Sequence, residues 1–335
     1  MKSPLLFNTL KNILRILAQW TLKKYKPAVI GITGSVGKTS TKEAVYTVLK
    51  GERNVRRSQG NFNNELGVPL TILGDYNAIR GILFWPKVIF QAIGQLLIFN
   101  KKYPEILVLE MAADRPGDIQ YLARLARPKI GVITSIGEIP VHVEFYSSPT
   151  AVAVEKARLI ELLPANGFAI LNRDDELVWN LRIKTRAHII SYGFKEDADI
   201  QIINFEYKFD ENEFPEGITF KIQYGNVFVP FRLFRVMGKP QIYSIAAAVA
   251  VGIVFGINLV KISDYLANYQ PPDHRMQIIK GIKNSVILDD CYNASPLSMK
   301  AALETLGHFT QRRRVAILGD MLELGKYTTE AHEEI

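Results

Sequence analysis

The feature that most constrains this chain is a glycine-rich segment between an apolar run and a helical pattern. Residues 28–33 are apolar and β-branched, which predicts a buried strand, and residues 38–50 predict a helix. Between them lies Gly34-Ser35-Val36-Gly37-Lys38-Thr39, and Ser40 follows. A glycine loop that leads into a helix start presents backbone amides and partial positive charge to phosphate oxygens. The segment therefore predicts an ATP-binding loop, with Lys38 on the β- and γ-phosphates and the Thr39 hydroxyl on Mg²⁺.

The loop is a variant, because the general motif has glycine where this chain has Ile32. Further apolar runs at residues 105–110, 129–134 and 168–171 predict buried strands separated by helices. This alternation predicts an α/β fold with a mostly parallel sheet between helices. Ligands of such sheets bind beyond the carboxyl ends of the strands.

Three regions are expected along the chain. Residues 1–26 predict a basic amphipathic helix, and residues 27–270 an ATP-binding domain that includes alternating strands between 188 and 234. After Pro271-Pro272, residues 285–289, 297–306 and 315–318 predict a strand, a helix and a strand. Residues 271–335 are therefore expected to form part of a Rossmann-like C-terminal domain.

The first helix and residues 79–99 are the most apolar parts of the chain, yet charged and polar residues interrupt both. No small-residue cleavage site follows the first helix, which argues against a signal peptide. The helix is expected either to pack on the next domain or to lie on a membrane surface. Residues 79–99 predict an interfacial or partner-binding helix rather than a span. The net charge of +8 suits phosphorylated ligands or an anionic membrane and favours nucleic acid less.

Polar residues near the predicted strand ends are candidates for the rest of the site. Glu110 closes a strand, where a carboxylate suits Mg²⁺, which prefers hard oxygen ligands. His142 lies in a loop after the next strand, and Lys156 lies on a helix. By pattern alone, His142 also fits a surface residue and Lys156 an exposed lysine. The single Cys291 excludes an internal disulfide framework and fits a reducing compartment such as the cytoplasm.

Four further stretches, together with the loop, give a resemblance to the Mur ligase family, and within it to the D-alanyl-D-alanine-adding members. They are residues 60–69 (GNFNNELGVP), 109–112 (LEMA), 289–296 (DDCYNASP) and 318–325 (LGDMLELG). The resemblance implies that Lys38 and the loop bind ATP, and that Thr39, Glu110 and Asn64 hold one Mg²⁺. It also implies a metal-site His142 and a carbamylated Lys156 at a second Mg²⁺. Arg275 and Asp290 would reach the nucleotide from the C-terminal domain.

The family resemblance implies a ligase of cell-wall synthesis. A carboxylate substrate would attack the γ-phosphate of ATP, and an amine such as D-alanyl-D-alanine would attack the resulting acyl phosphate. The expected catalytic residues are Lys38, His142 and Lys156. The small-molecule substrate would be a peptidoglycan precursor in the cytoplasm, with peripheral membrane contact through residues 1–26 and 79–99. Only about 26 residues precede the first predicted strand, so the family's uridine-binding domain is expected to be missing. The chain stops at Ile335, soon after the third domain begins, so the C-terminal domain is expected to be truncated. The alternatives are a poly-γ-glutamate-type synthase at the membrane and a non-catalytic nucleotide-binding protein.

Overall fold

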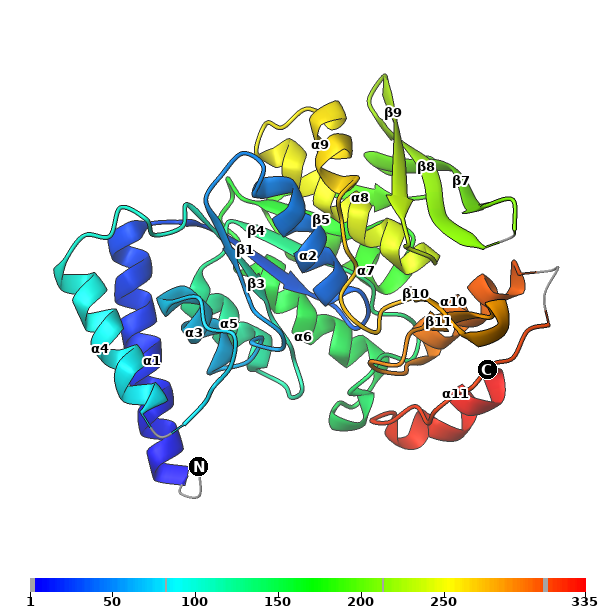
Figure 1. The fold of residues 1–335 in the computed structure, drawn as a ribbon. Helices are drawn as coiled ribbons and strands as arrows, with labels where there is room; N and C mark the ends of the chain where they lie inside the picture. Colours follow the sequence, from blue (N-terminus) through cyan, green and yellow to red (C-terminus); the bar gives the residue numbers. More distant parts are fainter. Residues whose placement is uncertain (1–3, 82, 213, 310–312) are drawn as a thin grey trace.

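A nine-stranded sheet forms the centre of the chain, described by a computed structural model for residues 4–81, 83–212, 214–309 and 313–335 (Figure 1). The strands are β1 (Ala28–Thr33), β2 (Val55–Arg57), β3 (Ile106–Glu110), β4 (Ile130–Ile133), β5 (Phe168–Asn172), β6 (His188–Gly193), β7 (Ile200–Phe209), β8 (Pro215–Tyr224) and β9 (Val227–Phe234). Their order across the sheet is β2-β3-β1-β4-β5-β6-β7-β8-β9. All neighbours up to β7 are parallel, and β7, β8 and β9 pair antiparallel. The expected α/β fold with a mostly parallel sheet is confirmed.

Helices cover both faces of the sheet. The α-helices of the described residues are α1 (Pro4–Tyr25), α2 (Lys38–Leu49), α3 (Gly67–Leu73), α4 (Phe84–Leu97), α5 (Asp118–Ala126), α6 (Pro149–Glu161), α7 (Glu176–Asn180), α8 (Lys239–Val254) and α9 (Leu259–Leu266), followed in the C-terminal segment by α10 (Pro296–Gly307) and α11 (Thr328–Glu334). Alternate residues of a strand point to opposite faces. Thus Ile30 and Ile32 of β1 join the core under α2, α8 and α9, whereas Val29 joins the core under α1, α3, α4 and α5.

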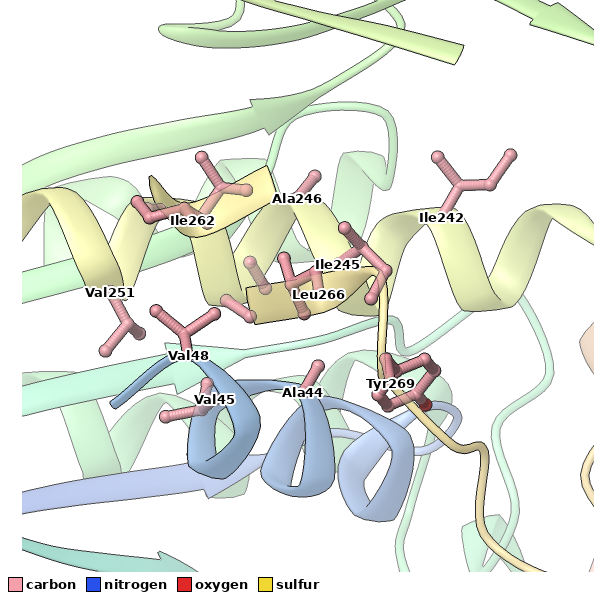
Figure 2. Packing of buried hydrophobic residues seen from close by; sticks show 14 of the residues in the cluster. Ala44, Val45, Val48, Ile242, Ile245, Ala246, Val251, Ile262, Leu266 and Tyr269 are labelled. Atoms are coloured by element: carbon pink, nitrogen blue, oxygen red, sulfur yellow. The ribbon is translucent and has the colours of Figure 1, made fainter. Parts of the chain in front are cut away.

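The α2–α8 contact shows how small residues bring two helices close together (Figure 2). Val48 of α2 points toward Val251 of α8, and Ala44 of α2 points toward Ile245 of α8 and Leu266 of α9; all five side chains are fully buried. Full burial of a valine-sized side chain contributes roughly 1.5–3 kcal/mol. This contact holds α2, and with it the loop between β1 and α2, firmly on the sheet.

The N-terminal helix packs on the domain that follows it, which was one of the two expectations for this helix. Leu14, Leu17 and Ala18 of α1 are buried against α3, α4 and α5. The helix ends at Tyr25, just before Pro27, where a proline disfavours helical conformation in the residue ahead of it. Within the described residues, no helix is long and apolar enough to cross a membrane.

The C-terminal segment differs from the expectation in one respect. Residues 286–289 form β11 (Val286–Asp289), which pairs antiparallel with β10 (Gln277–Lys280), and α10 follows as predicted. The strand expected at residues 315–318 is not formed, and Ile317 is 94% exposed. A strand needs a hydrogen-bonded neighbour, and among the described residues none runs beside this segment.

Candidate functional site

The polar residues of the site meet at the carboxyl ends of β1, β3 and β4. The loop Gly34–Thr39 follows β1, Glu110 is the last residue of β3, and Thr134 follows β4. Because these strands are parallel neighbours, their carboxyl ends share one edge of the sheet. A cleft at this edge is lined by loop residues together with Asn63, Glu110, Asp114, His142 and Arg275, among others.

The loop backbone requires its glycines. Gly34 has a φ of +152°, and a Cβ atom there would lie 1.9 Å from Thr134 Oγ1. Gly37 has a φ of +88° and precedes α2. Among the described residues, no side chain makes a capping hydrogen bond to the start of α2. The amides of Ser35 and Val36 donate to the carbonyl of Ser135, at 2.7 and 3.0 Å. The start of α2 is therefore the part of the loop best placed to bind an anion.

Lys38 is folded back onto its own loop. Its Nζ donates to the carbonyl oxygens of Gly34 (3.0 Å) and Ser35 (3.3 Å). Burial lowers the pKa of the Lys38 ammonium, and the negative charge of Glu110 opposes that shift. A cation held in place beside an uncapped helix start is suited to binding a phosphate group.

Glu110 supplies a buried carboxylate, 2% exposed, to the same cleft. Its Oε1 accepts a hydrogen bond of 3.1 Å from Asn63 Nδ2, whereas the buried Oε2 has no hydrogen-bond partner. Buried polar atoms normally find a partner. A buried carboxylate oxygen without a hydrogen bond, in a cleft that Thr39 also lines, fits a hard divalent cation such as Mg²⁺.

Asn64 was expected at the metal, but the structure gives its side chain another role. Asn64 Oδ1 accepts from the amides of Leu66 and Gly67, at 3.2 and 3.0 Å, at the start of α3. Its neighbour Asn63 lines the cleft and contacts Glu110. Of the two asparagines, Asn63 is therefore the one that this structure places against Glu110 in the cleft.

Lys42 belongs to the site and was not singled out from the sequence. Its Nζ lies 3.4 Å from Glu110 Oε2 and donates to the carbonyl of Gly60 at 3.2 Å, and the side chain is 1% exposed. It follows Lys38 by four residues, the spacing that places two side chains on one side of a helix. That spacing was the signal that could have identified it.

His142 lies where the C-terminal segment meets the domain that carries the loop Gly34–Thr39. Its Nδ1 is 2.6 Å from Glu323 Oε2, and its Nε2 is 3.7 Å from Asp114 Oδ1. Burial lowers the pKa of this imidazole, and the negative charge of Glu323 opposes the shift. Neither Glu323 nor Asp114 was expected at the site. They place two carboxylates beside the predicted metal-site histidine.

Lys156 on α6 is not an exposed lysine, since its side chain is 1% exposed. Burial lowers its pKa to about 7, and the positive charge of Lys38 adds to the shift. Within the described part of the chain, its ammonium has no ion-pair partner within 4.0 Å. A buried amine with a lowered pKa is a candidate functional residue, and Lys156 is not itself among the residues that line the cleft.

The C-terminal segment contributes Arg275 to the cleft. Its guanidinium lies 4.1 Å from the centre of the Tyr292 ring. Its positive charge contributes to the lowered pKa of the Lys38 ammonium. Asp290 lies beside it, where Oδ1 accepts from the Met276 amide at 3.1 Å and burial raises the carboxyl pKa to about 6. Neither Asp290 nor Ser40 is among the residues that line the cleft.

The sequence matches the models of two known protein domains. The sequence model of the Mur ligase middle domain matches residues 32–80 and 91–252, and that of the Mur ligase glutamate ligase domain matches residues 274–335. This chain belongs to the Mur ligase family.

Individual Mur ligases match along nearly the whole chain. A UDP-N-acetylmuramoyl-tripeptide–D-alanyl-D-alanine ligase of Bacillus subtilis is 32% identical over 325 residues, which is 96% of this chain and 62% of the relative. The enzyme of the same name from Escherichia coli is 30% identical over 321 residues, covering 95% and 63%. The chain thus spans about three fifths of the length of these relatives.

Solved Mur ligase structures share the fold. The MurF ligase of Thermotoga maritima in complex with ADP has a TM-score of 0.78 and 29% identity, covering 97% of this chain and 67% of that one. MurF of Acinetobacter baumannii has a TM-score of 0.79 and 25% identity, covering 96% and 63%.

Proposed function

We propose that this Mur ligase is an ATP-dependent amide ligase that acts in peptidoglycan synthesis. The observation that carries the proposal is the buried Glu110 carboxylate, whose Oε2 has no hydrogen bond, in the cleft lined by Lys38 and Thr39. A phosphate loop beside a buried carboxylate that can still accept a ligand is the arrangement that a nucleotide and its metal ion require. ATP is therefore the proposed cosubstrate, and the complex of a similar MurF with ADP supports this choice.

The roles of the residues follow from their positions. Lys38 would move from its loop carbonyls to the phosphates and offset charge that develops on the transferring phosphoryl group. Thr39, Glu110 and Asn63 would hold one Mg²⁺, and His142 with Lys156 a second. Bound Mg²⁺ neutralises phosphate charge and orients the oxygens for transfer. Arg275 would approach the nucleotide from the C-terminal segment.

Lys156 is suited to become a metal ligand by carbamylation. A pKa of about 7 leaves much of this amine neutral near pH 7. The neutral nitrogen would attack carbon dioxide, form an N–C bond and release a proton, which converts a cation into an anionic oxygen ligand. This change also removes an uncompensated positive charge from a buried position.

The proposed substrates are UDP-N-acetylmuramoyl tripeptide and D-alanyl-D-alanine. The names of the relatives that match 92–98% of this chain support them. The carboxylate would attack the γ-phosphate, ADP would leave, and the amine would then displace phosphate from the acyl phosphate. The site of action is proposed to be the cytoplasm, at the inner face of the membrane, with contact through residues 1–26 and 79–99.

Phosphate release from ATP by the natural full-length protein tests the substrate proposal. We expect release only when UDP-muramoyl tripeptide and D-alanyl-D-alanine are both present, and loss of it in Lys38→Ala. The matched control is Lys50→Ala, because Lys50 is an exposed lysine at the other end of α2. Release with glutamate-containing substrates and not with this pair would favour the poly-γ-glutamate-type synthase. Nucleotide binding without any turnover would favour a non-catalytic protein.

A further inference from the structure

Helices α1 and α4 carry large apolar side chains that the rest of the protein does not cover. In α1, Ile16 is 38% and Trp20 58% exposed. In and after α4, Phe90 is 74%, Leu97 79% and Phe99 62% exposed. We call this surface the two-helix face. Concentrated exposed apolar surface usually marks a site of interaction.

The two helices form one anchored unit at an edge of the molecule (Figure 1). Lys24 Nζ donates to the carbonyls of Gln95 and Leu96, at 2.8 and 2.9 Å, and Tyr25 OH donates to Gln95 at 2.8 Å. These bonds tie the end of α1 to the end of α4. The opposite sides of the helices are fixed in the core by residues such as Leu14 and Val88, both fully buried. The exposed side chains are therefore presented by a fixed scaffold.

The charge around the face has one sign. Residues 4–25 and 77–103 contain eight basic and no acidic residues, although the whole chain has 33 acidic residues. Lys23, Arg80, Lys87, Lys101 and Lys102 are exposed. Apolar side chains surrounded by lysine and arginine match a membrane surface with anionic headgroups, which attracts basic residues and accepts apolar ones.

The two-helix face also lies largely where the family model finds no match. The match to the Mur ligase middle domain begins at residue 32 and is interrupted at residues 81–90. The family model of the middle domain therefore does not include α1 or the first half of α4, although individual relatives match 96% of the chain.

We infer that the two-helix face docks this protein on an anionic membrane, with α1 and α4 lying along its surface. This inference rests on the membrane contact of the proposed function. It adds that the surface contacted is an anionic lipid bilayer, and it names the side chains that contact it. Apolar side chains such as Phe90 and Leu97 enter the headgroup region, and the basic residues contact lipid phosphates. Each basic residue near such a surface strengthens binding roughly fivefold at low salt.

Co-sedimentation with lipid vesicles tests the inference. The protein is mixed with vesicles of phosphatidylcholine alone or with added phosphatidylglycerol, at low and high salt. We expect binding to the anionic vesicles, weakened by salt. The double variant Phe90→Glu/Leu97→Glu should bind at least tenfold more weakly, because it removes two inserting side chains and adds two negative charges. Lys101→Glu/Lys102→Glu should also bind at least tenfold more weakly at low salt.

A matched control uses exposed apolar residues elsewhere. Val227 and Phe228 at the start of β9 are 52% and 55% exposed and lie away from α1 and α4 (Figure 1). Val227→Glu/Phe228→Glu should bind vesicles as the wild type does. Thermal unfolding and ATP binding in solution should be unchanged in Phe90→Glu/Leu97→Glu, which separates a docking defect from loss of fold or of ligase function.

Three results would overturn the inference. One is an absence of binding to anionic vesicles, and another is equal binding by the wild type and Phe90→Glu/Leu97→Glu. The third is self-association in sedimentation velocity that this variant abolishes, since the face would then be covered by a second copy of the chain.

Discussion

Replacement of Lys156 by methionine should stabilise the protein, by an amount that depends on pH. Lys156 is fully buried, and its pKa falls from 10.5 to about 7 on folding. A shift of one pKa unit corresponds to about 1.4 kcal/mol, so the buried charge costs about 5 kcal/mol of folding free energy. Methionine has a similar length and no charge, and it removes this cost.

The sign of the pH dependence follows from which state holds the proton. Below pH 7 both the folded and the unfolded state are protonated, so the full cost is present. Between pH 7 and 10.5 the amine is neutral in the folded state but still protonated in the unfolded state. The free energy needed to remove that proton on folding falls as the pH approaches 10.5, so the cost of burying Lys156 declines. The gain from Lys156→Met should therefore fall from about 5 kcal/mol at pH 6 to about 1 kcal/mol at pH 10.

Urea unfolding of wild type and variant at pH 6, 8 and 10 measures this difference. Lys50→Met serves as the control, because Lys50 is exposed and should show no such gain. The measurements are made in buffers free of carbon dioxide, so that carbamylation does not relieve the cost in the wild type. If Lys156→Met were no more stable than the wild type at pH 6, or if its gain did not vary with pH, the reasoning about this buried amine would be refuted.

Three further substitutions test the cleft. Glu110→Gln should raise the Mg²⁺ concentration needed for half-maximal phosphate release by roughly tenfold to a hundredfold, because an anionic ligand is lost; an unchanged requirement would exclude Glu110 as a ligand. Lys42→Met should destabilise the fold by roughly 3–5 kcal/mol in urea, since it leaves the buried Glu110 without its cationic partner; restoration by Lys42→Met/Glu110→Gln would show that the pair is responsible. Gly34→Ala should lower the melting temperature and abolish ATP binding, because its Cβ would lie 1.9 Å from Thr134 Oγ1; retention of both would contradict the observed loop geometry.

Features encoded by a regular period were predictable from the sequence. The run Ala28–Thr33 forms β1 as expected, and the predicted helix from residue 38 forms α2. Glu110 was identified because parallel strands bring their carboxyl ends to one edge. Lys42 could have been found by the same kind of argument, from the helical spacing with Lys38.

Features that depend on loops or on distant contacts were not predictable. Spacing cannot tell Asn63 from Asn64, because a loop has no period that fixes which side chain faces the cleft. The contact between His142 and Glu323 joins two domains, and no local pattern encodes it. The depth at which Lys156 is buried depends on the packing of α6 against the sheet, and by pattern alone this residue fitted an exposed lysine.

Nucleotide binding by the loop between β1 and α2 is the central claim of this account. Isothermal titration of the protein with ADP and Mg²⁺ tests it directly, with Lys38→Ala and Lys50→Ala as a matched pair. We predict that the wild type and Lys50→Ala bind equally and that Lys38→Ala binds roughly tenfold to a hundredfold more weakly, the loss typical of a charge-assisted contact. Binding that is undetectable in the wild type, or equal in Lys38→Ala, would contradict the claim.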